Sequence, residues 1–214
     1  YEGNFKNNFF HGKGKYSTSY GDNYTGDWKF GKKNGNGIYN SSLGDKYEGT
    51  WENDMKHQNG KYEFADGDVY IGFWNNDMMT GKGKYQFSNG EICEGEFLKG
   101  KLDGQGTFIF VNGNKYEGAF KKGKRDGFGT FKLSEGSIYI GEWKNDEING
   151  QGKYTFSNGN EYEGMFINGA MEGQGSYSFK NGNLYIGEFV DGKREGLGVF
   201  TYSNGNKYIG EFKN

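Results

Sequence analysis

A period of 23 residues runs through the chain and limits what it can fold into. Copies start at residues 12, 35, 58, 81, 104, 127, 150, 173 and 196, without an insertion or deletion. Residues 1–11 match the second half of an earlier copy, residues 12–195 form eight complete copies, and residues 196–214 form a ninth that stops at its nineteenth position. Self-similarity this regular predicts one continuous array of repeated supersecondary units.

Glycine and aromatic residues occupy fixed positions when each copy is numbered from 1 to 23. Positions 3, 10 and 15 are always Gly, position 5 is Tyr or Phe, and position 17 is Trp or Phe. Position 1 is Gly except for Gln58, and position 13 is Tyr except for Cys93. Positions 1, 3, 10 and 15 together hold 35 of the 41 glycines. Glycine therefore has a structural role at fixed positions of the repeat and does not form flexible linkers.

The spacing inside each copy is that of β-strands. Positions 3, 5 and 7 share one face of a strand, and so do positions 13, 15 and 17. An Asn-Gly turn signal at positions 9 and 10 lies between them in five copies. A two-residue turn there would place the two aromatic sets on opposite faces, so we expect a three-residue connection over positions 9–11. It pairs position 5 with 15 and position 3 with 17, and Gly at position 10 takes a positive φ.

The predicted fold class is therefore all-β. We expect an elongated, twisted, single-layer antiparallel meander, a rod of consecutive 23-residue β-hairpin repeats. Its open edges invite strand addition. The C-terminal edge predicts a twofold dimer through Phe200, Tyr202, Tyr208 and Phe212. A second candidate surface is an aromatic groove for an extended peptide or lipid. We assign to this groove Phe108, Tyr116, Phe120, Phe131, Tyr139 and Trp143.

Charge and composition argue against several classes of function. Lys and Arg number 26 against 28 Asp and Glu, interleaved along the chain, which gives no basic groove for nucleic acid. The two histidines form no Ser/His/Asp or Cys/His constellation, so we expect no enzyme. The densest basic run is Lys121, Lys122, Lys124 and Arg125, a candidate loop for anionic lipid, although Asp126 follows at once and favours an ordinary solvated loop.

Cys93 is the one departure from the aromatic pattern at position 13. A small apolar residue packed in the core is the simpler interpretation, and we expect no cofactor. The alternative is a structural zinc or disulfide at a dimer contact, with His57 or His11 as a further zinc ligand from either chain. One chain supplies too few ligands for such a site, since structural zinc takes about four.

The motif Gly-x-Gly-x-Tyr followed by Gly-x-x-Tyr-x-Gly-x-Trp resembles the MORN repeat (membrane occupation and recognition nexus). "GKGKYQFSNGEICEGEF" and "GQGKYTFSNGNEYEGMF" are clear instances, and the resemblance covers the whole chain. It implies a single-layer β-meander. Among members made only of such repeats, it is most similar to the cytoskeletal scaffold of apicomplexan parasites. That similarity implies a cytoplasmic, cytoskeleton-associated protein of the basal complex or inner membrane complex that acts in cell division.

The interpretation that follows is a non-enzymatic structural scaffold. It is a stiff, dimerising β-rod that organises cytoskeletal or membrane-associated proteins, with no nucleic acid partner. The alternative is a peripheral phospholipid-binding module, specifically for phosphoinositides, and the balanced charge disfavours it.

Overall fold

The computed structural model describes residues 1–213, which form β-strands and turns without a helix in that range. Two compact units divide the chain, one from Tyr1 to Val111 and the other from Asn112 onward. The first unit contains β1 (Glu2–Lys6), β2 (Phe9–Ser17), β3 (Asn23–Lys29), β4 (Lys32–Asn40), β5 (Lys46–Glu52), β6 (Met55–Glu63), β7 (Val69–Asn75), β8 (Met78–Gln86), β9 (Ile92–Leu98) and β10 (Lys101–Ile109). The second contains β11 (Lys115–Lys121), β12 (Lys124–Lys132), β13 (Ile138–Lys144), β14 (Glu147–Thr155), β15 (Glu161–Ile167), β16 (Ala170–Ser178), β17 (Leu184–Val190), β18 (Lys193–Thr201) and β19 (Lys207–Phe212).

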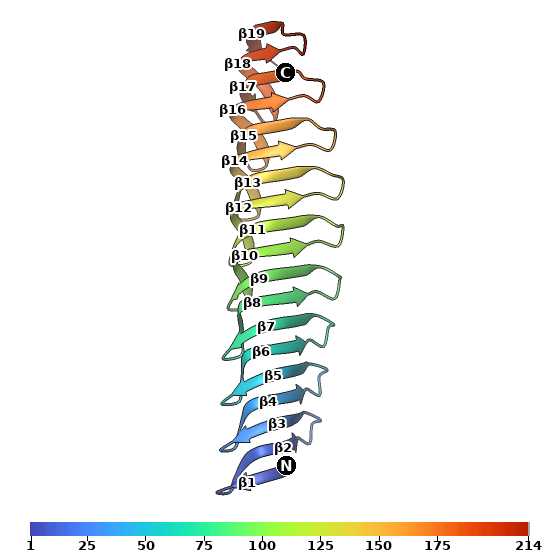
Figure 1. Ribbon diagram of the computed structural model, residues 1–214, viewed down its shortest axis with the longest axis vertical. Helices are drawn as coiled ribbons and strands as arrows, with labels where there is room; N and C mark the ends of the chain where they lie inside the picture. Colours follow the sequence, from blue (N-terminus) through green and yellow to red (C-terminus); the bar gives the residue numbers. More distant parts are fainter. Residues whose placement is uncertain (214) are drawn as a thin grey trace. The chain divides into compact units, whose positions relative to one another are not determined.

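Within each unit, every strand pairs antiparallel with the next strand along the chain (Figure 1). Each of the eight complete copies contributes a seven-residue strand over positions 12–18 and a nine-residue strand that runs from position 21 into the following copy. The predicted all-β class and the hairpin meander are confirmed. Consecutive hairpins are local connections, so each strand needs only its sequence neighbours for pairing.

The predicted register within the hairpin is wrong. Tyr16 pairs with Tyr24, Gly14 with Gly26, and Gly12 with Trp28, so position 5 faces 13, 3 faces 15, and 1 faces 17. The connection spans five residues, because Ser17 pairs with Asn23. Inside it, the Gly21 N–H donates to the Thr18 carbonyl at 3.2 Å and closes a β-turn.

The physical reason is the direction in which the tyrosine ring leans. The ring of Tyr24 does not cover a glycine directly opposite it. It lies over Gly26 in its own strand and over Gly37 in the next: a Cβ added at Gly26 would stand 2.6 Å from the Tyr24 hydroxyl oxygen. Side chains in strands lean along the strand direction, which the pairing argument ignored.

Positive φ at position 10 is confirmed in all nine complete turns, from Gly21 at 101° to Gly205 at 88°. The other connection of each copy is a two-residue turn at positions 19 and 20, which sequence reasoning missed. Both residues of this turn have positive φ, for example Asn53 at 50° and Asp54 at 71°. This is the type I′ geometry that fits the twist of antiparallel strands.

Candidate interaction surfaces

The core of each unit is a ladder of aromatic rings at positions 13 and 17. Tyr24 meets Trp28 at 5.0 Å between ring centroids and Trp51 of the next copy at 5.5 Å, both edge to face. The pattern continues through Tyr47, Trp51 and Trp74, and recurs in the second unit through Tyr139, Phe166, Tyr162 and Phe189. Edge-to-face pairs contribute about 0.5–1.5 kcal/mol each beyond the area that they bury.

Hydrogen bonds fix the ring ladder in place. The Tyr47 hydroxyl donates to the Thr50 carbonyl at 2.9 Å, and the Trp51 Nε1–H donates to the Gly37 carbonyl at 3.3 Å. Burial raises the pKa of Tyr70 to about 12. The ladder is therefore a closed, hydrogen-bonded core.

A second set of rings, at positions 5 and 7, is only half-buried. In the first unit Tyr62, Phe64, Tyr85 and Phe87 follow one another with centroid separations of 4.5, 5.7 and 4.7 Å. The Tyr85 hydroxyl donates to Asp68 at 2.6 Å, and this bond is the main reason that the pKa of the Asp68 carboxyl is lowered. These rings are the accessible part of the aromatic face.

The predicted peptide groove divides between these two sets. Tyr116 and Tyr139 have no exposed surface, and Phe120 and Trp143 are 6% and 4% exposed. Phe108 and Phe131 belong to the half-buried set at position 5. A ligand on this face would therefore contact position 5 and 7 rings, while the other four predicted residues form the floor beneath.

Position 22 contributes cations that sequence reasoning did not single out. The Lys33 ammonium lies 4.4 Å from the Trp51 ring centroid and 4.7 Å from that of Tyr39, and burial lowers the pKa of Lys33. Arg125 lies 4.2 Å from the Trp143 ring and 3.3 Å from the Asp146 carboxylate. Cation–π contacts of this kind are worth about 0.5–2 kcal/mol. The feature of the sequence that could have revealed these cations is a Lys or Arg two residues after the two-residue turn.

Arg125 is thus not a solvent-facing member of the predicted basic loop. Lys121 ends β11, Lys124 begins β12, and Lys122 lies in the turn between these strands. All three lysines are exposed. Asp126 pairs with Lys144 at 3.3 Å rather than with the loop. The basic surface available to a lipid here consists of three lysines on one turn.

Cys93 lies on β9, 5% exposed, and burial raises the pKa of its thiol to about 11. His57 lies on β6, with Nε2 3.3 Å from Glu52. Two strands separate β6 from β9, which at about 4.8 Å per strand places them about 14 Å apart. No group of three His, Cys, Asp or Glu within residues 1–213 could hold a metal. Zinc shared between two copies stays a prediction, to be tested by zinc titration with Cys93→Ser as control.

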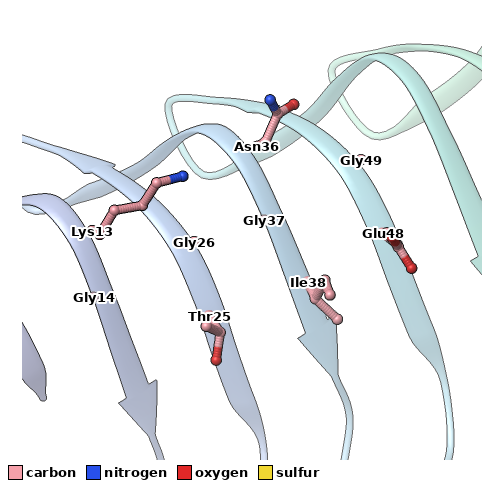
Figure 2. Close-up of a pocket in the computed structure, with 9 residues that line it drawn as sticks. All are labelled: Lys13, Gly14, Thr25, Gly26, Asn36, Gly37, Ile38, Glu48 and Gly49. Carbon is pink, nitrogen blue, oxygen red and sulfur yellow. The ribbon is translucent and has the colours of Figure 1, made fainter.

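The face opposite the rings carries positions 2, 4, 14 and 16. In the first unit it has a shallow hollow of about 680 Å³, and Figure 2 shows Lys13, Thr25, Asn36, Ile38 and Glu48 beside a row of glycines. Lys13 is paired with Asp27 at 2.8 Å. Charges of both signs and an open shape give this hollow no catalytic arrangement.

The C-terminal strand differs from the other position 12–18 strands in exposure. Tyr208 is 47% exposed, whereas Tyr139, Tyr162 and Tyr185 at the same position have no exposed surface. Tyr202 is 46% exposed, and Phe200 and Phe212 are half-buried. Phe212 meets Tyr185 at 4.7 Å and Tyr208 at 5.3 Å. Phe200 on β18 pairs with Tyr208 on β19, which also carries Phe212, and Tyr202 lies in the connection between these two strands.

Comparison with known families decides the family. The MORN repeat matches residues 1–21, 24–42, 47–69, 70–92, 93–115, 116–138, 139–161, 162–184 and 185–207. The chain belongs to the MORN-repeat family. All nine matches begin at position 13 of the 23-residue frame. A comparison with curated proteins gives no match.

Solved structures similar to this MORN array share its fold at low identity. The wild-type TCP10 domain of Danio rerio CPAP matches with a TM-score of 0.52 and 14% identity, over 92% of this chain and 93% of that one. The G-box domain of the microcephaly protein CPAP, whose structure is described as suggesting a role in centriole elongation, gives 0.51 and 13% over 95% and 100%. A Drosophila melanogaster SAS-4 TCP domain bound to a proline-rich motif of Ana2 gives 0.34 and 13% over 94% and 90%. That last likeness is too weak to carry its binding over to this chain.

Across the described residues, no helix has the length and hydropathy needed to cross a membrane.

Proposed function

We propose that this MORN array is a non-enzymatic structural scaffold that pairs with a second copy of itself and holds partner proteins at regular intervals. The observation that carries the proposal is one surface repeated along the array, because half-buried rings at positions 5 and 7 recur in successive copies with centroid separations of 4.5, 5.7 and 4.7 Å in the first unit. In the part of the chain that the structure describes, Tyr208 on β19 is 47% exposed. Strand addition by a second copy would bury it as Tyr185 at the same position is buried.

The geometry of β19 suits a twofold contact. An antiparallel partner strand would pair with its free edge, and the same surface on both copies would close the interface. Ile209, on the opposite face of β19, is 75% exposed, whereas Ile186 at the same position of β17 is 51% exposed with a strand on each side, so strand addition would cover part of Ile209. The dimer would therefore use Phe200, Tyr202, Tyr208 and Phe212 together with the backbone of β19.

Sedimentation equilibrium tests the dimer. We expect a concentration-dependent dimer for the unmodified chain and a monomer for Tyr202→Ser combined with Ile209→Lys, since an edge lysine opposes strand addition. Serine is already present at the position of Tyr202 in an earlier copy, at Ser41. The matched control is Phe87→Ser, an equivalent change away from the edge, which should leave the dimer intact. A monomeric unmodified chain would refute the proposal.

The cellular setting we propose is a cytoplasmic, cytoskeleton-associated assembly that acts in cell division, of the kind found at a basal complex or inner membrane complex. Membership of the MORN family and a fold shared with centriole proteins support a structural role over catalysis. Localising the tagged chain in dividing cells tests this setting. A diffuse distribution throughout division would contradict it.

Peripheral lipid binding is the competing function, favoured by the three exposed lysines at positions 121, 122 and 124. Flotation with liposomes at about 0.15 M salt, with and without phosphoinositides, separates the two, since that salt screens surface charges beyond about 8 Å. The scaffold proposal expects protein to stay at the bottom. Selective flotation that is lost when the three lysines become glutamine would replace it with the lipid-binding function.

A further inference from the structure

Six half-exposed aromatic rings form a continuous strip in the second unit, which we name the C-terminal ring strip. Its members occupy positions 5 and 7 of three successive copies. They are Tyr154, Phe156, Tyr177, Phe179, Phe200 and Tyr202. Successive centroids are 4.6, 5.7, 4.7, 5.7 and 4.9 Å apart. Each ring thus packs on its neighbours along one side and faces solvent along the other.

A hollow of about 360 Å³ lies beside this strip. Phe156, Tyr177 and Phe179 line one side of it, and Met171 and Arg194 at position 22 line the other. Phe189, 1% exposed, also lines it. The hollow has the apolar surface and size to accept one flat aliphatic ring.

The spacing of the strip selects the conformation of a ligand. Equivalent ring pairs recur every two strands, which at about 4.8 Å per strand is about 9.6 Å. A polyproline II helix has three residues per turn and rises about 3.1 Å per residue, so it repeats every 9.3 Å or so. An α-helix repeats every 5.4 Å or so, and alternate residues of a β-strand every 6.8 Å or so. The polyproline repeat therefore meets successive ring pairs more closely in phase than seven residues of an α-helix, which span about 10.5 Å.

Charge around the hollow selects the residues between the prolines. Lys193 lines the hollow at an exposed position, and the guanidinium of Arg194 lies 5.7 Å from the Phe200 ring. The residues that line the hollow include no Asp or Glu. Glu188 and Glu195 are opposite each other in the register of β17 and β18, and Glu188 is at position 16, on the opposite face. Glu172 accepts the Asp191 N–H at 2.9 Å. The hollow is therefore positive at one edge and complements an acidic ligand.

We propose that the C-terminal ring strip binds an extended proline-rich segment of a partner protein, with prolines three residues apart and acidic residues between them. The inference rests on the proposed scaffold function, because it names the chemistry of a protein held by the array. Aromatic-lined grooves bind such segments because the polyproline helix is already formed before binding and loses little entropy. One proline ring fills the hollow, and the acidic residue after it lies against Lys193 and Arg194.

Fluorescence anisotropy with a labelled synthetic peptide tests the proposal on the full chain. The peptide carries prolines at every third residue and glutamates between them, and its control has the same composition with the prolines adjacent. We expect saturable binding of the first peptide and at least tenfold weaker binding of the second. Equal binding of the two would overturn the proposal.

Two variants locate the site without disturbing the fold. Phe179→Ser introduces a residue found at the same position in Ser41, and should weaken binding about tenfold, as expected for an aromatic contact residue. Arg194→Met introduces a residue found at the same position in Met79 and Met171, and should weaken the acidic peptide but not one with glutamine in place of glutamate. Phe87→Ser, in the first unit, should change nothing. Unchanged binding by Phe179→Ser, or an equal loss in Phe87→Ser, would overturn the assignment.

Failure of this inference is distinguishable from failure of the scaffold. Sedimentation is measured without the peptide and reports pairing through β19, and the binding variant Phe179→Ser changes a ring of the strip that is not among the dimer residues, unlike Phe200 and Tyr202. A dimer that ignores both peptides leaves the scaffold standing and removes the proline-rich partner.

Discussion

Replacing Gly175 by alanine isolates the contact on which the ring core depends. Gly175 is at position 3, and a Cβ there would lie 2.6, 2.7 and 2.9 Å from Cε2, Oη and Cζ of Tyr162. Carbon atoms pack best at about 3.5–4.0 Å, so the ring would have to move by about 1 Å. The ring of Tyr162 is fully buried, and its centroid lies 5.1 Å from that of Phe166 and 4.9 Å from that of Phe189. These neighbouring rings oppose such a movement.

The expected loss combines two effects. Overpacking of this kind costs about 1–3 kcal/mol. Displacing the Tyr162 hydroxyl from the Met165 carbonyl, which it reaches at 2.9 Å, removes a hydrogen bond worth about 1 kcal/mol. Gly175→Ala should therefore lower the free energy of unfolding by about 2–4 kcal/mol. Urea unfolding followed by far-ultraviolet circular dichroism measures it, and hydrogen exchange in β15 and β16 shows whether the loss is local.

A double-mutant cycle separates the ring contact from a general intolerance of alanine. Tyr162→Cys introduces the residue that this chain has at the same position in Cys93, and it removes the ring. In that background Gly175→Ala should cost at least about 1.5 kcal/mol less than in the unmodified chain. Gly90→Ala is the control: φ there is 95° and nothing lies within 4 Å, so its cost reflects backbone strain and should not change. Equal costs of Gly175→Ala in the two backgrounds would refute the reasoning.

Three further perturbations test other contacts. Trp51→Phe and Trp143→Phe both shrink a buried ring that carries a cation–π contact, but only Trp51 donates a hydrogen bond, to the Gly37 carbonyl, while Trp143 Nε1 is buried without a partner among the described residues. Trp51→Phe should therefore cost about 1 kcal/mol more than Trp143→Phe; equal losses in urea unfolding would contradict this. Gln58→Gly should stabilise by about 1 kcal/mol, because Gln58 has φ of 54° where other copies have glycine; an unchanged urea midpoint would contradict it. The pKa values of Tyr62, Tyr116 and Tyr162 are raised by burial to about 12 from 10.0, so the contribution of these tyrosines to stability should be constant below pH 10 and fall as pH rises towards 12. Urea midpoints measured across this pH range should fall as the absorbance of tyrosinate rises.

The repeat frame predicted the fold class and the face shared by the rings, because both follow from the parity of strand positions. It also predicted the positive φ at position 10, since glycine at the same turn position in every copy indicates a backbone conformation that other residues reach only at a cost. The register failed because parity allows several pairings, and the choice depended on where the ring of position 13 leans. That direction depends on contacts with two strands at once, Gly26 and Gly37 for Tyr24, which a single-hairpin argument does not include.

The candidate surfaces were harder to predict than the fold, for a related reason. Positions 5, 13 and 17 are all aromatic in sequence, yet burial separates them: Tyr139 and Trp143 are 0% and 4% exposed, while rings at positions 5 and 7 remain half-exposed. The separation follows from pairing, since position 13 lies between two position 17 rings and position 5 does not. Position 22 was missed because its cations alternate with methionine, leucine and isoleucine along the chain, which hides them from a search for a charge that recurs in every copy.

In an array of near-identical copies, the departures from the pattern are the informative residues. A residue that is the same in nearly every copy, such as Tyr162 or Tyr185, indicates only how the core packs. Lys193 and Arg194 stand where the copy before has Ala170 and Met171, and these two differences place positive charge in the lining of the hollow. Positions 7 and 22 vary from copy to copy around a nearly constant ring ladder, so the variants that test binding specificity in this chain begin with the side chains at these two positions.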